Sequence, residues 1–80
     1  MPQYYLHMRN GTGFVEDGQG QEFAGEDEAR QEAMLAARDI MAGELRAGAL
    51  DLTARIEVTD AEGKLLFSLI FADAVTITSR

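Results

Sequence analysis

"GEDEARQEAMLAARDIMAGELRA" (residues 25–47) is the longest stretch of the chain with a single periodicity. It is rich in alanine, contains no proline and has one β-branched residue, Ile40, a composition that favours helix. Acids at positions 26, 27 and 28 lie in its first turn, near the positive end of the helix dipole. Gly48 follows the last turn as a natural C-cap. The stretch therefore predicts one helix of about 20 residues.

The predicted helix is amphipathic, because steps of about 100° per residue gather its apolar side chains on one side. Glu32, Asp39 and Arg46 lie on the other side. Small side chains in the apolar stripe would let the helix lie close to a sheet. The expected stripe consists of Ala29, Ala33, Ala36, Ala37 and Ile40, with Met34, Met41 and Leu45 beside it. Glu44 also falls on this stripe. Either the end of the helix is open to water there, or Glu44 bonds Arg55 or the loop amides near residues 50–52, since a buried carboxylate needs partners.

Segments of alternating polarity lie on both sides of the helix and are typical of β-strands. Before the helix they are "QYYLHMR" (residues 3–9) and "FVE" (14–16), and after it "LTARIEVTD" (52–60) and "KLLFSLIF" (64–71). Asn10-Gly11 is a strong hairpin signal, because both residues tolerate a positive φ, and "DAEG" (60–63) makes a second turn. "ADAVTI" (72–77) is expected to continue the last strand after a bulge or bend.

This order predicts an α+β fold, ββαββ, in a single small domain over residues 1–80. Hairpin connections favour a four-stranded antiparallel sheet, with the amphipathic helix across one face and the first and last strands in the middle. The residues expected to face the helix are Tyr4, Leu6, Met8, Phe14, Ile56, Val58, Phe67, Leu69 and Phe71.

The other face of the sheet is the main functional candidate. It is expected to carry Tyr5, His7, Leu66, Ser68 and Ile70. One helix cannot cover both faces, and an uncovered face is usually polar, whereas this one holds two aliphatic side chains and a tyrosine. An apolar patch of this kind often marks an interface, so we expect a homodimer packed sheet to sheet or edge to edge. The alternative is a monomer in which arginine and tyrosine side chains shade these residues.

Composition narrows the classes of partner. The chain has 80 residues, a net charge of −7 and no cysteine, which rules out disulfides and thiolate zinc sites. A surface this negative repels phosphate backbones and acidic lipid, so we expect neither nucleic-acid nor membrane binding. The longest apolar run, residues 65–75, is too short to span a bilayer, and the N-terminal stretch lacks the pattern of a secretory signal. The expected location is the cytoplasm.

Sequence motifs that would indicate metal binding or catalysis are weak. Asp17 and Glu28 match the two ends of a calcium-binding loop, but Gln19 and Gln21 are neutral and Glu22 replaces the required glycine, so a turn and a helix start are the better interpretation. His7 is the only histidine and has no cysteine or histidine to join it at a metal. A catalytic group of His7 with Ser68 and Asp73 lacks a nucleophile-elbow motif.

These observations predict a binding domain that is not an enzyme and has no cofactor. A second hypothesis is an acidic regulatory partner of a basic protein, in the manner of an antitoxin or inhibitor. It would use the acids between Glu26 and Glu32, together with Asp39.

Nearly the whole chain resembles a domain-of-unknown-function family of short proteins that is common in alphaproteobacteria such as rhizobia. The resemblance rests on "PxYYLHMRNG" (2–11), "DGQGxEF" (17–23), "ELRAGxLDL" (44–52) and "RIEVTDAEGKLLFSLIFADAV" (55–75). It implies the family's typical layout, and it implies no activity, cofactor or catalytic residue. Gly25 and Ile70 stand where the resemblance leads us to expect Asp and Pro, which implies a weaker helix cap and a less edge-like last strand.

Overall fold

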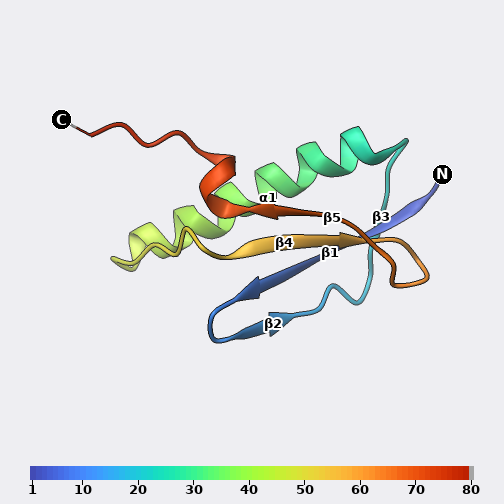
Figure 1. The fold of residues 1–80 in the computed structure, drawn as a ribbon, viewed down its shortest axis with the longest axis horizontal. Coiled ribbons are helices and arrows are strands. Elements are labelled where there is room, and N and C mark those ends of the chain that lie inside the picture. The colour runs from blue at the N-terminus through green and yellow to red at the C-terminus, as the bar shows by residue number, and fades with distance from the viewer. Residues whose placement is uncertain (80) are drawn as a thin grey trace.

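An antiparallel sheet and a helix lying across one of its faces make up the computed structural model, which describes residues 1–79 (Figure 1). Within these residues the strands are β1 (Gln3–Asn10), β2 (Gly13–Val15), β3 (Gln21–Glu22), β4 (Arg55–Thr59) and β5 (Leu65–Ile70). The helices are α1 (Glu26–Arg46) and the short 3₁₀-helix η1 (Phe71–Ala74). The α+β class is therefore confirmed, but the sheet has five strands, and the predicted order ββαββ holds only approximately.

The strand order is β2-β1-β4-β5, with β3 pairing with the start of β1. The first strand is central as predicted, but the prediction was wrong for the last one, because β5 lies at the edge. The β4–β5 turn keeps these strands adjacent, so only one of them can also pair with β1. β4 takes that inner place and supplies Ile56 and Val58 to the core.

β2 and β3 run along the same side of β1 with an interruption between them. The register along β1 shifts by two residues from β2 to β3, so residues 16–20 leave the sheet there. Asp17 fills the gap, because its Oδ2 accepts the N–H of Leu6 at 3.1 Å. The sequence pattern predicted only a turn in this region.

The first hairpin turns at Gly11-Thr12, one residue later than predicted. Neither residue has a positive φ, and the turn is held instead by the side chain of Asn10, whose Oδ1 accepts the N–H groups of Thr12 and Gly13 at 2.9 Å. This register pairs Phe14 with Arg9. Antiparallel partners project on the same side of a sheet, so Phe14 faces away from α1 and its inward placement was wrong.

Helix α1 buries the alanine stripe: Ala29, Ala33, Ala37 and Met41 are buried, and Met34 and Ile40 pack against the core. The prediction that Leu45 extends the stripe was wrong, since Leu45 is 61% exposed. At the end of the helix, Gly48 has φ 88°, and the N–H groups of Gly48 and Ala49 donate to the carbonyls of Leu45 and Glu44. This is the Schellman arrangement expected of a glycine there.

The core closes around Val58 and Phe71, the largest side chains that are fully buried. The expected continuation of β5 beyond Phe71 was wrong: the chain turns into η1, which packs on α1 (Figure 1). The N–H of Phe71 donates to the carbonyl of Ala54, and Arg38 Nε donates to the carbonyl of Ala74 at 2.8 Å. Turning here buries Phe71 instead of leaving it on an exposed strand.

Candidate functional site on the outer face and edge of the sheet

The face of the sheet that points away from α1, here called the outer face, is built by rows of cross-strand partners. One row runs His7, Glu57, Ser68 and the next runs Arg9, Arg55, Ile70, in the order β1, β4, β5. Tyr5 and Thr59 form a third row toward the β4–β5 turn. The outer face therefore brings together four of the five predicted interface residues, Tyr5, His7, Ser68 and Ile70.

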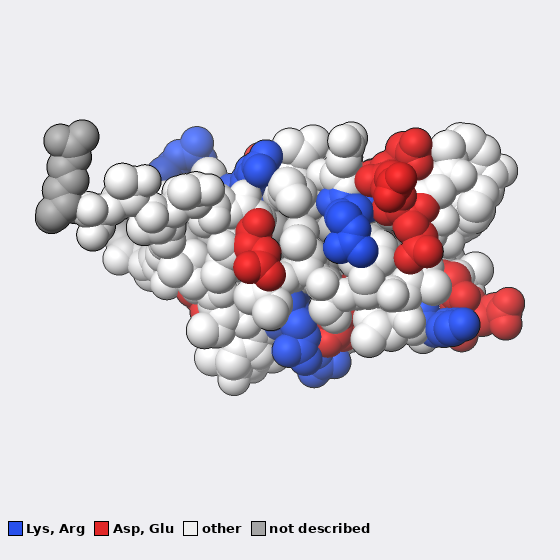
Figure 2. Space-filling view, turned by 45° about the horizontal axis from the view of Figure 1, so that its top comes forward, with Lys and Arg blue, Asp and Glu red and all other residues white. Residues whose placement is uncertain are grey.

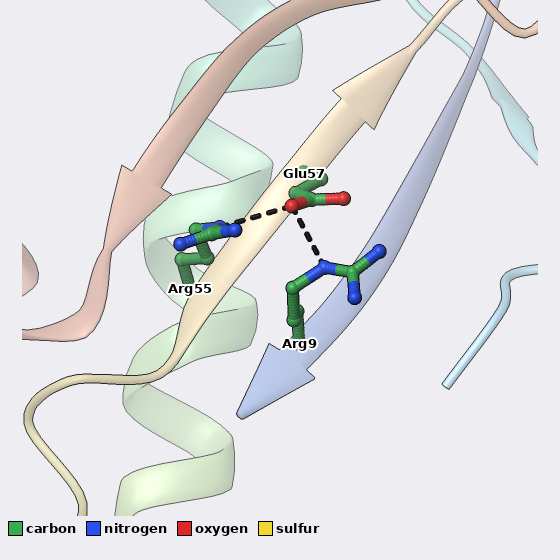
Figure 3. Close-up of polar contacts among 3 residues, drawn as sticks. All are labelled: Arg9, Arg55 and Glu57. Carbon is green, nitrogen blue, oxygen red and sulfur yellow. Dashed lines mark hydrogen bonds and ion pairs between the residues drawn. The ribbon is translucent and has the colours of Figure 1, made fainter. Parts of the chain in front are cut away.

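An ion-paired group occupies the middle of this face (Figure 3). Glu57 Oε2 accepts from Arg55 Nε at 2.9 Å and from Arg9 Nε at 3.0 Å. The hydrogen bond from Arg55 is the main cause that lowers the pKa of Glu57, and Arg9 adds to it although burial acts in the opposite direction. The Glu57 side chain is only 16% exposed and already bonds both arginines. A partner covering this face would remove the remaining water from the three charges without adding a bond to Glu57, which opposes binding.

Phe14 is shaded on the outer face by its cross-strand partner. The guanidinium of Arg9 lies 4.4 Å from the centroid of the Phe14 ring, a cation–π geometry, and the His7 ring lies at 5.5 Å on another side. Phe14 remains 41% exposed. Arg9 and His7 therefore cover part of Phe14, a residue that the sequence had placed on the other face.

His7 joins β1 to β4 and to the excursion at residues 16–20. Its Nδ1 accepts the N–H of Asp17 at 3.0 Å, and its Nε2 lies 3.0 Å from Thr59 Oγ1. Because Nδ1 is an acceptor, the neutral ring carries its proton on Nε2 and donates it to Thr59. Tyr5 stacks parallel to the His7 ring, with centroids 6.3 Å apart. Both ring nitrogens are therefore used to hold the sheet and the loop together.

A shallow hollow of about 250 Å³ lies beside His7, lined also by Tyr5, Asp17, Thr59 and Gly63. The Asp17 carboxylate is already committed, because it accepts the N–H groups of Leu6, Gln19 and Gly20. Burial raises its pKa, but these three hydrogen bonds and the nearby His7 together lower the pKa below its usual value.

The calcium interpretation can be checked at the same position. Over residues 1–79, no three His, Cys, Asp or Glu side chains come together in a way that could hold a metal ion. Asp17 serves backbone amides of the loop, and Glu28 lies in the first turn of α1. The sequence spacing therefore reflects an Asx-type turn followed by a helix start.

The edge strand β5 holds Leu66, Ser68 and Ile70. Leu66 lies at a bulge opposite Thr59 and packs in part against the core, whereas Ser68 is exposed and Ile70 is 45% exposed. In the part of the chain that the structure describes, no strand pairs with β5 on the side away from β4. β5 carries no charged residue. Leu65 is a further exposed apolar residue that the sequence interpretation missed, because its face depends on the bulge.

The backbone of β5 offers unpaired groups at this edge. Antiparallel partners alternate between pairs that exchange backbone hydrogen bonds and pairs that do not. The bond from the N–H of Phe71 to Ala54 sets this alternation, so Phe67 and Leu69 turn their amides toward β4. Ser68 and Ile70 therefore turn their N–H and C=O groups away from the sheet, toward the open edge.

Glu44 has one of its two predicted partners, a loop amide, since its Oε1 accepts the N–H of Asp51 at 3.1 Å. This confirms the loop-amide partner and leaves Arg55 to Glu57. Glu44 is thus a brace between the end of α1 and the loop that leads to β4.

Comparisons with known proteins identify a family and nothing more specific. Among residues 1–79, no helix has the length and apolar character needed to cross a membrane. No curated protein and no solved structure matches the chain. The family model described as "Domain of unknown function (DUF6894)" matches residues 3–72, which is most of the sequence. The chain therefore belongs to the DUF6894 family of domains of unknown function.

Proposed function

We propose that this protein is a binding module, not an enzyme, and that it acts by associating with a second copy of itself through β5 and the adjoining part of the outer face. One observation carries the proposal: β5 is an uncharged edge strand that ends in exposed Ile70 and has no partner strand within residues 1–79. Natural edge strands are usually protected by charges, proline or a covering element, because they otherwise pair with other chains. A specific partner strand would provide that protection.

The edge is a better contact than the centre of the outer face. Sheet-to-sheet packing would bury Arg9, Arg55 and Glu57, whose desolvation opposes association. Edge pairing leaves this group in water and satisfies the backbone groups of Ser68 and Ile70. Of the two homodimer arrangements expected from the sequence, we therefore propose the edge-to-edge one.

The test is the molar mass in solution, measured by size-exclusion chromatography with light scattering. We expect roughly twice the 8.8 kDa of one chain. Ser68→Lys places a charge on the open edge and should return the mass to that of one chain. Val15→Lys, on exposed β2 at the opposite edge, is the matched control and should keep the doubled mass. A wild-type mass of one chain at high concentration, or a doubled mass for Ser68→Lys, contradicts the proposal.

A second candidate function is that of an acidic partner of a basic protein. Exposed acids Glu26, Asp27 and Glu28 gather where α1 begins, and Figure 2 shows red side chains clustered at that end of the molecule. Clustered negative charge would steer a basic partner toward this end. The test is a pull-down that returns a basic protein, whose binding should be lost when the acids from Glu26 to Glu32 and Asp39 become amides and kept in Ser68→Lys. Recovery of the same protein by the amide variant would contradict this function.

A further inference from the structure

We infer that two copies of this chain join their β5 strands antiparallel about a two-fold axis at Ser68, forming one continuous sheet with both α1 helices on the same face. This inference rests on the proposed self-association and adds the register and a second contact. In this inference, the strand that pairs with the open edge of β5 is the β5 strand of a second copy.

The register follows from where β5 is regular. With the axis at Ser68, residues 66–70 of the two copies overlap, Ser68 faces itself, and Leu66 faces Ile70. An axis at Leu69 would leave only residues 68–70 of the two strands overlapping. With an axis at Phe67, the hydrogen-bonded pairs would be 66 with 68 and 64 with 70. Each of these pairs includes a residue of the segment 64–66, where β5 is bulged against Thr59. The axis at Ser68 is therefore the one that combines a long overlap with a regular central pair.

Side-chain chemistry also favours a second copy at this register. Apolar residues of β5 meet apolar residues in this register, with Phe67 beside Leu69 on the face toward α1 and Leu66, at the bulge, next to Ile70. Just outside the strand, Lys64 precedes β5 and Asp73 follows it in η1, and both are exposed. An antiparallel pair brings the lysine of each copy to the end of the strand where the other copy carries its aspartate. The β5 edges of two copies are therefore complementary, both in the placement of apolar residues and in charge.

Helix α1 supplies the second contact. Figure 3 shows α1 passing behind β4 and β5, with β1 to one side of it. Arg30 lies over the Phe67 ring at 4.1 Å and Arg38 bonds Ala74, so this side of the helix faces β5 and η1. Adjacent strands are about 4.8 Å apart and packed helices about 8–10 Å apart, so a second α1 over the same extended sheet comes within packing distance.

A hollow marks where that second helix would touch. It has a volume of about 220 Å³ and is lined by Gln31, Met34, Leu35 and Arg38. Leu35 is 53% exposed and projects from the side of α1 opposite the buried alanines, whereas Met34 lies between Arg30 and Arg38 on the side that faces β5. Contact between the two helices would cover Met34 and fill this hollow.

Single cysteines test the register, because the chain has none of its own. Bonded antiparallel partners have Cα atoms about 5.5 Å apart, within disulfide range. Ser68→Cys should therefore form a covalent dimer under mild oxidation, seen on a non-reducing gel. In the same register, two copies of residue 70 are about 14 Å apart at ~3.4 Å per residue, so Ile70→Cys alone should stay uncoupled. A mixture of Ile70→Cys with Leu66→Cys should form the mixed disulfide.

A pair of neighbouring variants tests the helix contact. Met34→Glu should weaken dimerisation at least tenfold, measured by analytical ultracentrifugation, whereas Leu35→Glu, on the side of α1 that points away from the sheet, should leave it unchanged. Circular dichroism on each variant checks that the fold is kept.

The outcomes separate this inference from the proposed function. A doubled wild-type mass with no coupling of Ser68→Cys, or with coupling of Ile70→Cys alone, overturns the register and leaves self-association standing. Equal weakening by Met34→Glu and Leu35→Glu overturns the helix contact. A wild-type mass of one chain overturns both the inference and the function on which it rests.

Discussion

The carboxylate of Asp17 takes the place of a missing strand partner. It accepts the N–H of Leu6 where β2 and β3 are interrupted, and it closes its own loop by accepting from Gln19 and Gly20. Asp17→Ala would leave these donors without a partner in the protein, at a cost of about 1–3 kcal/mol in the free energy of unfolding, measured with urea. Glu16→Ala, at the exposed neighbouring position, should change it by less than ~0.5 kcal/mol. Equal effects of the two variants would show that the loop does not depend on this carboxylate.

The same residue makes stability depend on acid pH. The pKa values of Asp17 and Glu57 are lowered in the folded chain, so the unfolded chain binds protons more readily. Their contribution is fully present above the unfolded pKa of about 4 and is lost as pH falls through the lower folded values. Urea unfolding between pH 6 and pH 2 should therefore show stability falling on the acid side. Asp17→Asn, which cannot titrate, should flatten this fall, and an unchanged slope would contradict the assignment.

The contacts of a single residue were predictable from the sequence where they depend on one helix or strand alone. Glu44 was predicted to bond either Arg55 or the loop amides, because the helical wheel places it near the end of the buried stripe, and the structure shows the loop amide of Asp51. Phe14 was misplaced, because its face depends on which residues of the hairpin pair across the turn, and hydrophobicity does not determine that register. Asp17 was placed in a turn, after a calcium loop had been considered, and its bond to Leu6 was not predicted, since the gap that it fills exists only once β2 and β3 both lie against β1.

The two ends of helix α1 are unequally capped, and this suggests a stabilising change. Its C-terminal end has the full Schellman bonding at Gly48, whereas the N-cap, Gly25, provides no side-chain hydrogen bond. A Cβ at Gly25 would have room, with Glu28 Oε2 the nearest atom at 3.6 Å. Gly25→Ser would create the capping box Ser-x-x-Glu with Glu28 and should raise the free energy of unfolding by about 0.5–1 kcal/mol above Gly25→Ala. The alanine variant controls for the loss of glycine, and equal stabilities would rule out the cap.

Elements were predictable where periodicity is local. The alanine-rich repeat defined α1, and alternation defined β1 and the β4–β5 hairpin, since each pattern reflects one buried face. The order of the strands was not predictable, because local alternation does not say whether β4 or β5 pairs with β1. The turn into η1 also depends on distant contacts, namely burial of Phe71 under α1 and the bond of Arg38 to Ala74.

At the scale of the whole molecule, a small core and an open edge connect folding to association. Val58 and Phe71 are the largest fully buried side chains among residues 1–79, and a chain of 80 residues buries a smaller fraction of its surface than larger domains do. Pairing of two β5 strands would add buried apolar area and backbone hydrogen bonds that one chain lacks. The stability of the fold should then include a term that depends on protein concentration.

Thermal unfolding at different concentrations measures that term. For a dimer that unfolds to two chains, each tenfold dilution removes about 1.4 kcal/mol per dimer, or roughly 0.7 kcal/mol per chain. For a domain of this size that lowers the midpoint by about 3–6 °C, provided that the dimer predominates before heating. Ser68→Lys should melt at one temperature at all concentrations, because its open edge repels a second copy. Val15→Lys should keep the wild-type dependence, since its charge lies at the far edge of the sheet. A wild-type midpoint that does not move with dilution would mean that each chain folds alone and that β5 is stable without a partner.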